Sequence, residues 1–458
     1  MTQPQPWVNE ANVALVTDLY ELTMLQAYWH ERMQGRAVFS LFFRRLPARR
    51  NYMVACGTGD VLDYLETLHF SSESLDHLAG LGRFSDAFLR WLADFRFTGD
   101  VHAMPEGTPV FPNEPLLQVE APIAQAQLVE SYLMNQVHLQ TVLASKASRV
   151  VTAARGRPVV DFGLRRMHGV DAGIRGVRAY YVAGLAATSN VLAGQIYGMS
   201  VTGTMAHSYI QAHEDELHAF RAFAALYPDT TLLVDTYDTL EGVRRVIRLK
   251  EELGEAFRVS AIRLDSGDLA RLAIESRELL DAAGMTDVRI VVSGGLSEEK
   301  VAEILERGAP VDGFGVGTHM GVSEDEPTLD LAYKLTEYEG VGRLKRSPGK
   351  ATLPGRKQVF RIEEDGRALR DVIGRHDEQH PGRPLLRTVM RQGRRTPGGE
   401  VSLDAARERA ADECRRLPER ILALPPATRP YPVEISPALR AYTDETLRRL
   451  QATEAAGP

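Results

Sequence analysis

The sequence predicts an α/β protein with a parallel α/β barrel in the middle of the chain. A second, mostly β domain is expected to be built from both chain ends. Between residues 158 and 318, apolar runs of about four residues recur, and each ends in a polar or glycine-rich turn. Segments with the apolar period of a helix separate most of these runs, so strand, turn and helix repeat. Outside this stretch, short β-type runs and prolines prevail.

Length and composition set the class of protein. At 458 residues the chain exceeds the size at which one core stops growing, so we expect more than one domain. The content of 44% hydrophobic and 25% charged residues is that of a globular protein, and no apolar run is long enough to cross a bilayer. Met1 to Glu10 lacks the basic and apolar regions of a signal peptide, which predicts a cytoplasmic protein without a membrane partner.

Charge and cysteine content exclude two further kinds of site. A net charge of -7 and a pI near 6.0 argue against a nucleic-acid partner, which normally requires a basic surface. Cys56 and Cys414 lie far apart without a Cys-x-x-Cys spacing, so we expect neither a disulfide framework nor a cysteine-based zinc site. No residue is assigned as a metal ligand. Because the net charge is negative, a phosphate site would have to be a small group of basic residues and backbone N–H groups rather than a broad basic surface.

The first part of the chain, residues 1–122, is predicted to belong to the discontinuous domain. Val13 to Gln26 indicates a strand-like entry into a helix, with Thr17 and Asp18 as candidate N-caps. Val38 to Phe43 is rich in β-branched and aromatic residues, which is typical of a strand. Residues 97–121 alternate apolar positions with turns, which indicates a small antiparallel sheet.

The barrel is predicted to cover residues 123–335 and to open with a long helix from Ile123 to about Val151. The expected strands are 158–163, 200–204, 231–236, 260–268, 290–295 and 311–318, and the clearest helices are 240–253, 269–283 and 298–307. An open doubly wound sheet would also bring the carboxyl ends of its strands to one side. We prefer the barrel because the repeat continues without a halving of topology, and we expect polar residues at the strand ends to handle the substrate.

The last part, residues 336–458, returns to short strands and basic turns. It is predicted to pair with the N-terminal sheet and so to complete the discontinuous domain. Ser402 to Arg416 and Pro437 to Leu450 have the pattern of surface helices. Nothing in this part resembles a site.

The segment from Val201 to Ser208 is the one around which the predicted barrel is organised. A β-type run is expected to meet a Gly-Thr turn and then a long helix that begins at Ala206. Such a turn directs backbone N–H groups to one spot, which suits a phosphate or another anion. His207 in the first helical turn can orient a phosphate, transfer a proton or attack a phosphoryl group. A lone histidine at such a position more often caps or packs, so its role depends on its surroundings.

Other strand-end turns supply groups that suit a phosphorylated sugar. The glycines allow the backbone to approach a terminal phosphate closely, and the arginines can clamp a pyrophosphate or a carboxylate. The aspartates can accept hydrogen bonds from sugar hydroxyls or hold a Mg²⁺ that is bound to phosphates. Each residue alone can equally be a strand-end salt bridge, and their convergence at one mouth favours a site. The set is Arg165, Arg166, Asp235, Arg263, Asp265, Gly294, Gly295, Gly317 and Thr318.

An ordered series of motifs resembles those of the nicotinate phosphoribosyltransferase family. Each motif alone is weak evidence, whereas the series in register is specific and covers residues 17–335. The motifs are 17–24 (TDLYELTM), 42–47 (FFRRLP), 162–166 (FGLRR), 203–208 (GTMAHS), 233–238 (LVDTYD), 262–268 (IRLDSGD) and 315–318 (GVGT).

The resemblance implies an irregular α/β barrel beside a domain built from both chain ends, assembled as a homodimer with shared active sites. It also implies a ligase-class enzyme that transfers phosphoribosyl from phosphoribosyl pyrophosphate to nicotinate. The products would be nicotinate mononucleotide and pyrophosphate, in the first step of NAD salvage from nicotinate. The implied partners are nicotinate, phosphoribosyl pyrophosphate and ATP, which is hydrolysed in the coupled reaction, with Mg²⁺ carried by the pyrophosphate.

The resemblance also implies roles for individual residues. His207 and Asp265 would be the catalytic residues, with His207 accepting a phosphoryl group from ATP. Thr204 and Arg263 would contact nicotinate, the arginine through the carboxylate, and Tyr20 would stack near the pyridine ring. The remaining substrate-binding and phosphate-binding residues would be Arg165, Arg166, Asp235, Gly294, Gly295, Gly317 and Thr318.

Two alternatives stay open at this point. The chain can be a phosphoribosyltransferase that uses nicotinamide, because base choice that depends on one arginine is fragile. It can also be a non-catalytic barrel that binds a sugar phosphate. The presence of His207, Arg263 and Asp265 counts against the second alternative.

Overall fold

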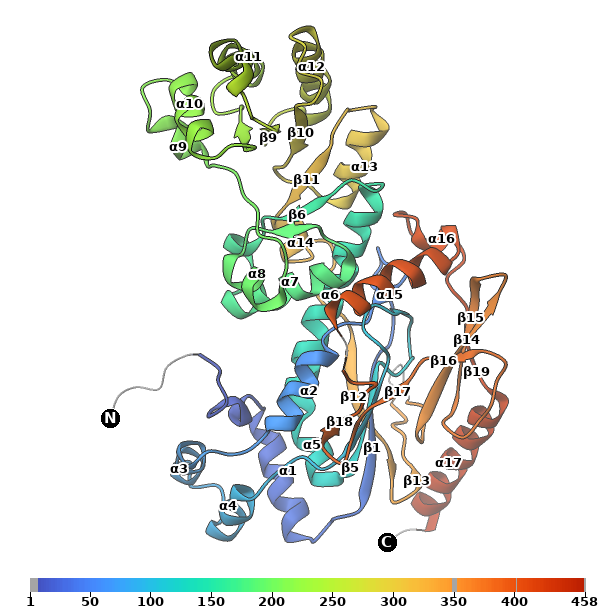
Figure 1. Cartoon of the computed structure of the whole chain (residues 1–458). Helices are drawn as coiled ribbons and strands as arrows, with labels where there is room; N and C mark the ends of the chain where they lie inside the picture. The colour runs from blue at the N-terminus through green and yellow to red at the C-terminus, as the bar shows by residue number, and fades with distance from the viewer. Residues whose placement is uncertain (1–6, 348–351, 401, 457–458) are drawn as a thin grey trace. The chain divides into compact units, whose positions relative to one another are not determined.

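The computed structural model describes residues 7–347, 352–400 and 402–456. The chain forms two compact units, whose elements are labelled in Figure 1. Unit 1 combines Met1–Val142 with Thr328–Pro458, and unit 2 is Leu143–Pro327. Residues 1–6, which contribute to the signal-peptide argument, lie outside the described residues.

These bounds differ from the predicted division after residues 122 and 335. Helix α5 (Ile123–Leu128) packs against α1 (Leu19–His30) and against β1 (Arg36–Phe43), so it belongs to unit 1. Strand β12 (Leu331–Tyr338) pairs antiparallel with β1 along nearly its whole length, which places the chain after Thr328 in unit 1. Helix α6 (Glu130–Ala153) begins in unit 1 and ends in unit 2. The points at which the sequence pattern changes, after residues 122 and 335, are therefore not the points at which the chain passes from one compact unit to the other.

Unit 1 is built on an antiparallel sheet of seven strands in the order β13-β12-β1-β5-β3-β17-β18. Three N-terminal strands form its centre, and C-terminal strands flank them on both sides, since β12 pairs with β1 and β17 pairs with β3. The buried side chains of β1 explain why this strand is central, because all its residues except Arg36 are buried. The other bounds are β3 (Asp100–Ala103), β5 (Leu117–Pro122), β13 (Val341–Gly342), β17 (Arg387–Arg391) and β18 (Arg394–Arg395).

Two smaller sheets and several helices complete unit 1. The sheets are β16-β14-β15-β19, with bounds Arg383–Pro384, Lys357–Glu364, Arg367–Arg375 and Val433–Ile435, and β2-β4, with bounds Met53–Val54 and Pro109–Val110. The further helices are α2 (Thr58–Thr67), α3 (Ser72–Gly80), α4 (Asp86–Ala93), α15 (Leu403–Arg416), α16 (Glu419–Leu422) and α17 (Pro437–Ala456). The helices predicted near residues 402–416 and 437–450 are thus confirmed.

The predicted strand-like entry to α1 is wrong, because Val13–Leu15 forms a 3-10 helix. Asp18 precedes α1 as its N-cap residue, yet its side chain does not cap the helix. The Asp18 carboxylate instead accepts a hydrogen bond of 2.7 Å from the Ser131 hydroxyl. The Asp18 side chain therefore bonds Ser131, which is distant in the sequence, instead of a backbone N–H in the first turn of α1.

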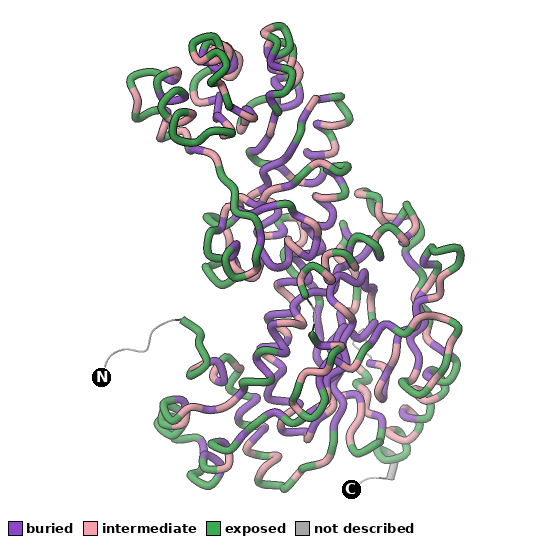
Figure 2. The backbone as a smooth tube through the Cα atoms, viewed as in Figure 1, coloured by how far each residue is buried: buried purple, intermediate pink, exposed green. Residues whose placement is uncertain are grey.

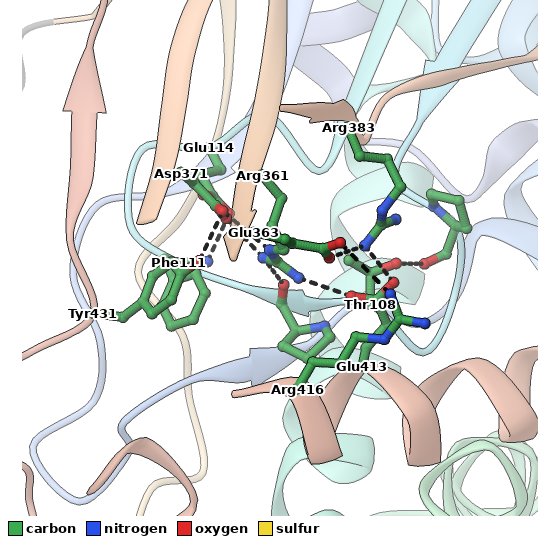
Figure 3. Close-up of polar contacts among 12 residues, drawn as sticks. Thr108, Phe111, Glu114, Arg361, Glu363, Asp371, Arg383, Glu413, Arg416 and Tyr431 are labelled. Carbon is green, nitrogen blue, oxygen red and sulfur yellow. Dashed lines mark hydrogen bonds and ion pairs between the residues drawn. The ribbon is translucent and has the colours of Figure 1, made fainter. Parts of the chain in front are cut away.

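Arg361 forms the centre of a buried ion cluster in unit 1 (Figure 3). Its guanidinium donates to both carboxylate oxygens of Asp371, at 3.0 and 2.7 Å, and to Glu413 at 3.2 Å. The Tyr431 hydroxyl donates to Asp371 at 3.0 Å, and Glu114 accepts a hydrogen bond from the backbone N–H of Phe111. These charges come from segments far apart in the sequence, so they join the two chain ends within one core.

Unit 2 is built on a parallel sheet of six strands in the order β7-β6-β11-β10-β9-β8. Their bounds are β6 (Val159–Asp161), β7 (Ala187–Thr188), β8 (Thr231–Leu233), β9 (Ala261–Leu264), β10 (Arg289–Val292) and β11 (Gly313–Val316). Figure 2 shows the buried backbone of this sheet in purple, and every residue of β11 is buried. The prediction of repeated parallel strands is confirmed for β6, β8, β9, β10 and β11.

The strand predicted at residues 200–204 is wrong. Val201 makes a single parallel bridge to Thr188, and the edge strand is β7, which the sequence analysis does not identify. Val201 is 49% exposed, so this segment buries too little apolar surface to continue the sheet. Residues 203–206 are then free to form a turn rather than a strand end.

The helices of unit 2 mostly follow the strands in the predicted order. Helices α11 (Thr239–Leu253), α12 (Leu269–Ala282) and α13 (Glu298–Glu306) confirm the prediction, and the side chains of Asp238, Asp268 and Ser297 cap them. The long helix expected from Ala206 is wrong: α9 (His207–Gln211) is short, and α10 (Glu216–Leu226) begins anew behind the Asp215 cap. The remaining elements are η2 (Leu164–Arg166), α7 (Val170–Ala183), α8 (Val191–Tyr197), η3 (Gly254–Ala256) and α14 (Thr318–Gly321).

Both units are therefore of mixed α and β structure, with an antiparallel sheet in unit 1 and a parallel sheet in unit 2. Within the described ranges, we find no helix with the length and apolar character of a transmembrane span.

Candidate functional site

A cavity of about 570 Å³ lies at the carboxyl ends of the parallel strands of unit 2. This is the edge of the sheet at which the sequence predicts a site. All predicted site residues except Tyr20 and Asp235 line it. The lining residues are Phe162, Arg165, Arg166, Ser189, Gly203, Thr204, Met205, Ala206, His207, Leu233, Arg263, Asp265, Ser293, Gly294, Gly295, Gly315, Gly317 and Thr318.

Arg263, at the end of β9, connects several walls of the cavity. Its guanidinium donates to the Thr204 hydroxyl at 2.7 Å, to the Ser293 hydroxyl at 2.8 Å and to Asp265 at 2.7 Å. Its guanidinium carbon also lies 5.3 Å from the centre of the Phe162 ring, within range of a cation–π contact. The side chain is 15% exposed, so it is held in place while part of it faces the cavity.

Asp265 is held as a carboxylate within this network. Burial alone would raise its pKa, but hydrogen bonds from Ser293 and Arg263 outweigh that effect, with help from the charges of Arg263 and His207. Together they hold the pKa of Asp265 below its usual value. Its other oxygen lies 3.8 Å from His207 Nε2. The cavity thus contains a fixed negative charge beside the histidine.

Asp235 lies behind the cavity wall rather than in it. One of its carboxylate oxygens accepts hydrogen bonds from the backbone N–H of Asp265 at 2.8 Å and from the Ser266 hydroxyl at 2.6 Å. The residue is 8% exposed. Its contacts therefore fix the turn after β9 and so the direction of Asp265.

His207 is the first residue of α9 and has a half-exposed side chain. Its Nδ1 lies 3.1 Å from the hydroxyl of Thr236, which is in the turn after β8, while Nε2 lies on the Asp265 side. These two neighbours fix the ring and leave it open to the cavity. A ring held in this way is suited to proton transfer or to nucleophilic attack.

The predicted phosphate-binding residues come together from three turns. Arg166 donates to the Thr318 hydroxyl at 3.4 Å, and Thr318 is the first residue of α14. Gly294 and Gly295 follow β10 with φ angles of 88° and 59°, a region that favours glycine. A Cβ atom on Gly294 would lie 1.8 Å from the carbonyl oxygen of Asp265, so this turn requires glycine. Gly294 and Gly295 are exposed and line the same cavity as the two arginines.

Several residues in or next to the cavity lining are not among those assigned from the sequence, and Thr236 is the one of them outside the lining. Phe162 lies under Arg263, and Ser293 donates a short hydrogen bond to Asp265. Ser189 follows β7, and Thr236 contacts His207. A strand end marks Phe162, Ser293 and Thr236 in the sequence, whereas Ser189 depends on a two-residue strand that has no clear pattern.

Two predictions concern groups that this cavity does not contain. Tyr20 lies in α1 of unit 1, with 48% of its surface exposed. Within the described residues, no three His, Cys, Asp or Glu side chains are grouped as a metal-binding cluster.

Comparisons with known proteins place the chain in a family. Residues 15–138 match the nicotinate phosphoribosyltransferase N-terminal domain, and residues 158–358 match the nicotinate phosphoribosyltransferase family. A nicotinate phosphoribosyltransferase of Mycobacterium tuberculosis is 55% identical over 423 residues, which cover 92% of this chain and 91% of the relative. One of Bacillus subtilis is 39% identical over 389 residues, covering 83% and 79%.

The fold leads to the same family. The crystal structure of human nicotinic acid phosphoribosyltransferase superposes with a TM-score of 0.83 at 29% identity, covering 94% of this chain and 99% of the human one. The cavity at the strand ends, the ordered motifs and the similarity over nearly the whole length agree. The chain belongs to the nicotinate phosphoribosyltransferase family.

Proposed function

We propose that this chain transfers phosphoribosyl from phosphoribosyl pyrophosphate to nicotinate, giving nicotinate mononucleotide and pyrophosphate. The observation that carries the proposal is one cavity that combines arginines and glycine turns for phosphates with Arg263, Asp265 and His207. The named relatives support the substrate pair, since both bear the name nicotinate phosphoribosyltransferase.

Arg263 and Phe162 suit the aromatic acid. Four contacts occupy four of the five N–H groups of Arg263: those to Ser293, Thr204, the Met205 carbonyl and Asp265. The remaining N–H has no partner among the described residues. It can donate to a substrate carboxylate, and the Phe162 ring gives the pyridine a flat wall. A positive charge at this place favours nicotinate over the uncharged nicotinamide.

The arginine turn and the glycine turns suit the sugar substrate. Arg165 and Arg166 line the cavity beside Thr318, where a pyrophosphate or a phosphate monoester finds several donors. The backbone N–H groups at Gly294, Gly295 and Gly317 add uncharged donors for the 5-phosphate. Asp235, through its hold on Asp265, contributes to binding of the sugar.

The reaction needs positioning more than covalent chemistry. Loss of pyrophosphate leaves positive charge at the ribose C1, and the pyridine nitrogen must lie in line with the breaking bond. We propose that Asp265 stabilises that charge, because its carboxylate is ionised and lines the cavity. Mg²⁺, brought in by the pyrophosphate, supplies charge neutralisation to the leaving group. Asp265 is the carboxylate of the cavity lining that would fit such an ion.

ATP coupling is the second part of the proposal. His207 is held by Thr236 on one nitrogen and faces Asp265 on the other, so it is oriented to accept a phosphoryl group. A phosphorylated His207 would add negative charge at the turn that carries Thr204. This change would reorganise the turn and tighten substrate binding.

We also propose that the sheet of unit 2 belongs to an irregular barrel and that unit 1 is the discontinuous domain of the family. Both follow the resemblance of the motifs, with the parallel sheet as support. The assembly would be a homodimer of a cytoplasmic enzyme, with Tyr20 stacking near the pyridine ring of a shared site.

The test is to incubate the purified chain with nicotinate, phosphoribosyl pyrophosphate and Mg²⁺, with and without ATP, and to measure nicotinate mononucleotide. We expect product in the native protein and stimulation by ATP that is lost in His207→Ala. A parallel reaction with nicotinamide should yield far less product. The absence of product under every condition would contradict the proposal.

Two outcomes separate the alternatives. Faster turnover with nicotinamide than with nicotinate would assign the chain to the nicotinamide-using enzymes. Thermal stabilisation by phosphoribosyl pyrophosphate without turnover would indicate a sugar-phosphate-binding protein.

A third outcome concerns His207 alone. Turnover that neither ATP nor His207→Ala changes would leave the transferase activity as proposed and would give His207 a structural role.

A further inference from the structure

Three segments that line the cavity converge on a pair of buried residues behind it, Asp161 and Thr188. Asp161 is the last residue of β6 and is 1% exposed, and Thr188 ends β7 and is 0% exposed. The Thr188 hydroxyl donates to the Asp161 carboxylate at 2.7 Å. Neither residue lines the cavity.

The arginine turn is the first of the three segments. The other oxygen of Asp161 accepts a hydrogen bond of 2.8 Å from the backbone N–H of Gly163, which opens η2. A Cβ atom on Gly163 would lie 3.0 Å from that oxygen, so glycine allows the close approach. The carboxylate thus fixes the direction in which Arg165 and Arg166 leave the sheet.

The second segment carries Ser189. Its backbone N–H donates to the Asp161 carbonyl at 2.9 Å. The next N–H, that of Asn190, donates to the Thr188 hydroxyl at 3.0 Å. The Thr188 hydroxyl therefore accepts one hydrogen bond, from Asn190, and donates one, to Asp161. These two bonds fix the orientation of the hydroxyl.

The third segment leads to Thr204 and His207. The Thr188 backbone accepts from Thr202 at 2.9 Å and donates to Ser200 at 3.0 Å. This bridge is the sheet contact of a segment whose residues 200–203 are exposed. Thr188 therefore anchors the start of the turn that carries Thr204, in addition to the contacts of Arg263 with Thr204 and Met205.

Asp161 holds its place through these neutral donors. Among the described residues, no lysine or arginine forms an ion pair with it, and burial raises the pKa of its carboxyl group despite the hydrogen bonds from Thr188 and Gly163. A buried carboxylate without a cation is costly for stability. A role in holding the cavity segments in place would account for a carboxylate at this buried position.

We propose that Asp161 and Thr188 are positioning residues that set the arginine turn and the Thr204 to His207 turn relative to each other. The inference rests on the proposed function and goes beyond it. A displacement of about 1 Å at a site can cost up to about 100-fold in rate. Loss of the hydroxyl should therefore weaken substrate binding although no substrate contact is removed.

The experiment compares Thr188→Val, which keeps the shape and removes the hydroxyl, with Thr188→Ser, which keeps the hydroxyl. We expect Thr188→Val to raise the KM for phosphoribosyl pyrophosphate and for nicotinate about tenfold, with a smaller change in kcat. Stimulation by ATP should fall, because the His207 turn moves. Thr188→Ser should retain native KM values.

Thr336→Val is the matched control, because Thr336 is a buried threonine of unit 1 whose hydroxyl donates to a backbone carbonyl. It should lower the melting temperature without changing either KM. A Thr188→Val protein with native KM values would overturn the proposal, and so would a Thr188→Ser protein with the same defect as Thr188→Val.

Two further measurements keep the test decisive. If Thr188→Val does not fold, Asp161→Asn replaces it and should raise the same KM values, because its amide offers one acceptor where the carboxylate offers two. If the native protein shows no turnover, the proposed function fails, and calorimetry with phosphoribosyl pyrophosphate then tests the pair by itself. Equal affinity in the native protein and Thr188→Val would overturn the positioning role.

Discussion

Two arginines of this chain have nearly the same neighbours and opposite surroundings. Arg263 donates to Asp265 at 2.7 Å and lies 5.3 Å from the Phe162 ring. Arg361 donates to Asp371 at 2.7 Å and lies 5.8 Å from the Phe111 ring. Arg361 is fully buried in unit 1, whereas the Arg263 side chain is 15% exposed and lines the cavity of unit 2.

The difference lies in what the neighbours leave open. Arg361 bonds Asp371, Glu413 and the Pro109 carbonyl in a sealed core, with Tyr431 closing the other side of Asp371 (Figure 3). Such a cluster can join chain segments but cannot take a ligand. The network of Arg263 faces a cavity and keeps one N–H available. An arginine with a carboxylate and a ring is therefore a binding group only where its surroundings stay open.

The largest expected effect is on stability, in Arg361→Met. Removal of the guanidinium leaves Asp371 buried without its cation and leaves Glu413 with Arg383 alone, which should cost about 3–5 kcal/mol of unfolding free energy. Urea unfolding followed by a probe in unit 1 measures it. Arg383→Met is the control, because the Arg383 side chain is 33% exposed and its loss should cost less than about 1 kcal/mol. Equal losses in the two variants would contradict the sealed cluster.

Arg263→Gln should affect activity instead. The charged donor to the nicotinate carboxylate is lost, so kcat/KM for nicotinate should fall about 100-fold, the equivalent of about 3 kcal/mol. Steady-state kinetics at saturating phosphoribosyl pyrophosphate measure this, with nicotinamide as the second base. A similar fall for both bases would mean that Arg263 does not read the carboxylate.

The sealed cluster should also depend on pH through Glu114. Burial, and then the neighbouring Asp371, raises the pKa of Glu114 well above its usual value, and Arg361 offsets this only in part. A raised folded-state pKa gives stability that is present below the unfolded-state pKa and is lost as pH rises through the folded-state value. Unit 1 should be less stable at pH 8 than at pH 5.

Glu114→Gln isolates that contribution. Its amide keeps an acceptor for the Phe111 N–H but does not titrate, so the difference in stability between pH 5 and pH 8 should shrink. Urea midpoints at both pH values measure it. An unchanged pH dependence would show that Glu114 is not the titrating group.

The smallest effects come from removing one hydroxyl beside each aspartate. Ser293→Ala removes a donor to Asp265, and Tyr431→Phe removes one to Asp371. Each should cost about 1 kcal/mol. Ser293→Ala should raise the KM for nicotinate a few-fold, while Tyr431→Phe should lower only the melting temperature. A raised KM in Tyr431→Phe, or an unchanged KM in Ser293→Ala, would contradict the distinction between an open network at Arg263 and a sealed one at Arg361.

The two arginines also show what the sequence can and cannot predict. Arg263 stands at a strand end within a motif, and strand ends meet at one edge of a parallel sheet, so its place in the cavity follows from local pattern. Arg361 lies in an ordinary strand, and its partners Asp371, Glu413 and Tyr431 come from other elements. The β14–β15 hairpin pairs Arg361 with Asp371 locally. No local pattern brings Glu413 and Tyr431 to this pair, so the buried cluster as a whole could not be predicted.

The same physics explains the errors within unit 2. Strand β7 has only two residues, too few for a periodic signal, and the segment around Val201 has strand-like residues but remains exposed. The helix after Ala206 ends at Gln211, because Asp215 offers a stronger start for the next helix. Long strands and capped helices were predictable, whereas short connecting segments depend on tertiary contacts.

The most direct measurement is nicotinate mononucleotide formation per folded chain in the native protein, Arg263→Gln and Arg361→Met, at a temperature where all three are folded. We predict that Arg361→Met keeps the native rate and that Arg263→Gln loses most of it. Full activity in Arg263→Gln would contradict the claim that the cavity of unit 2 is where nicotinate binds and reacts.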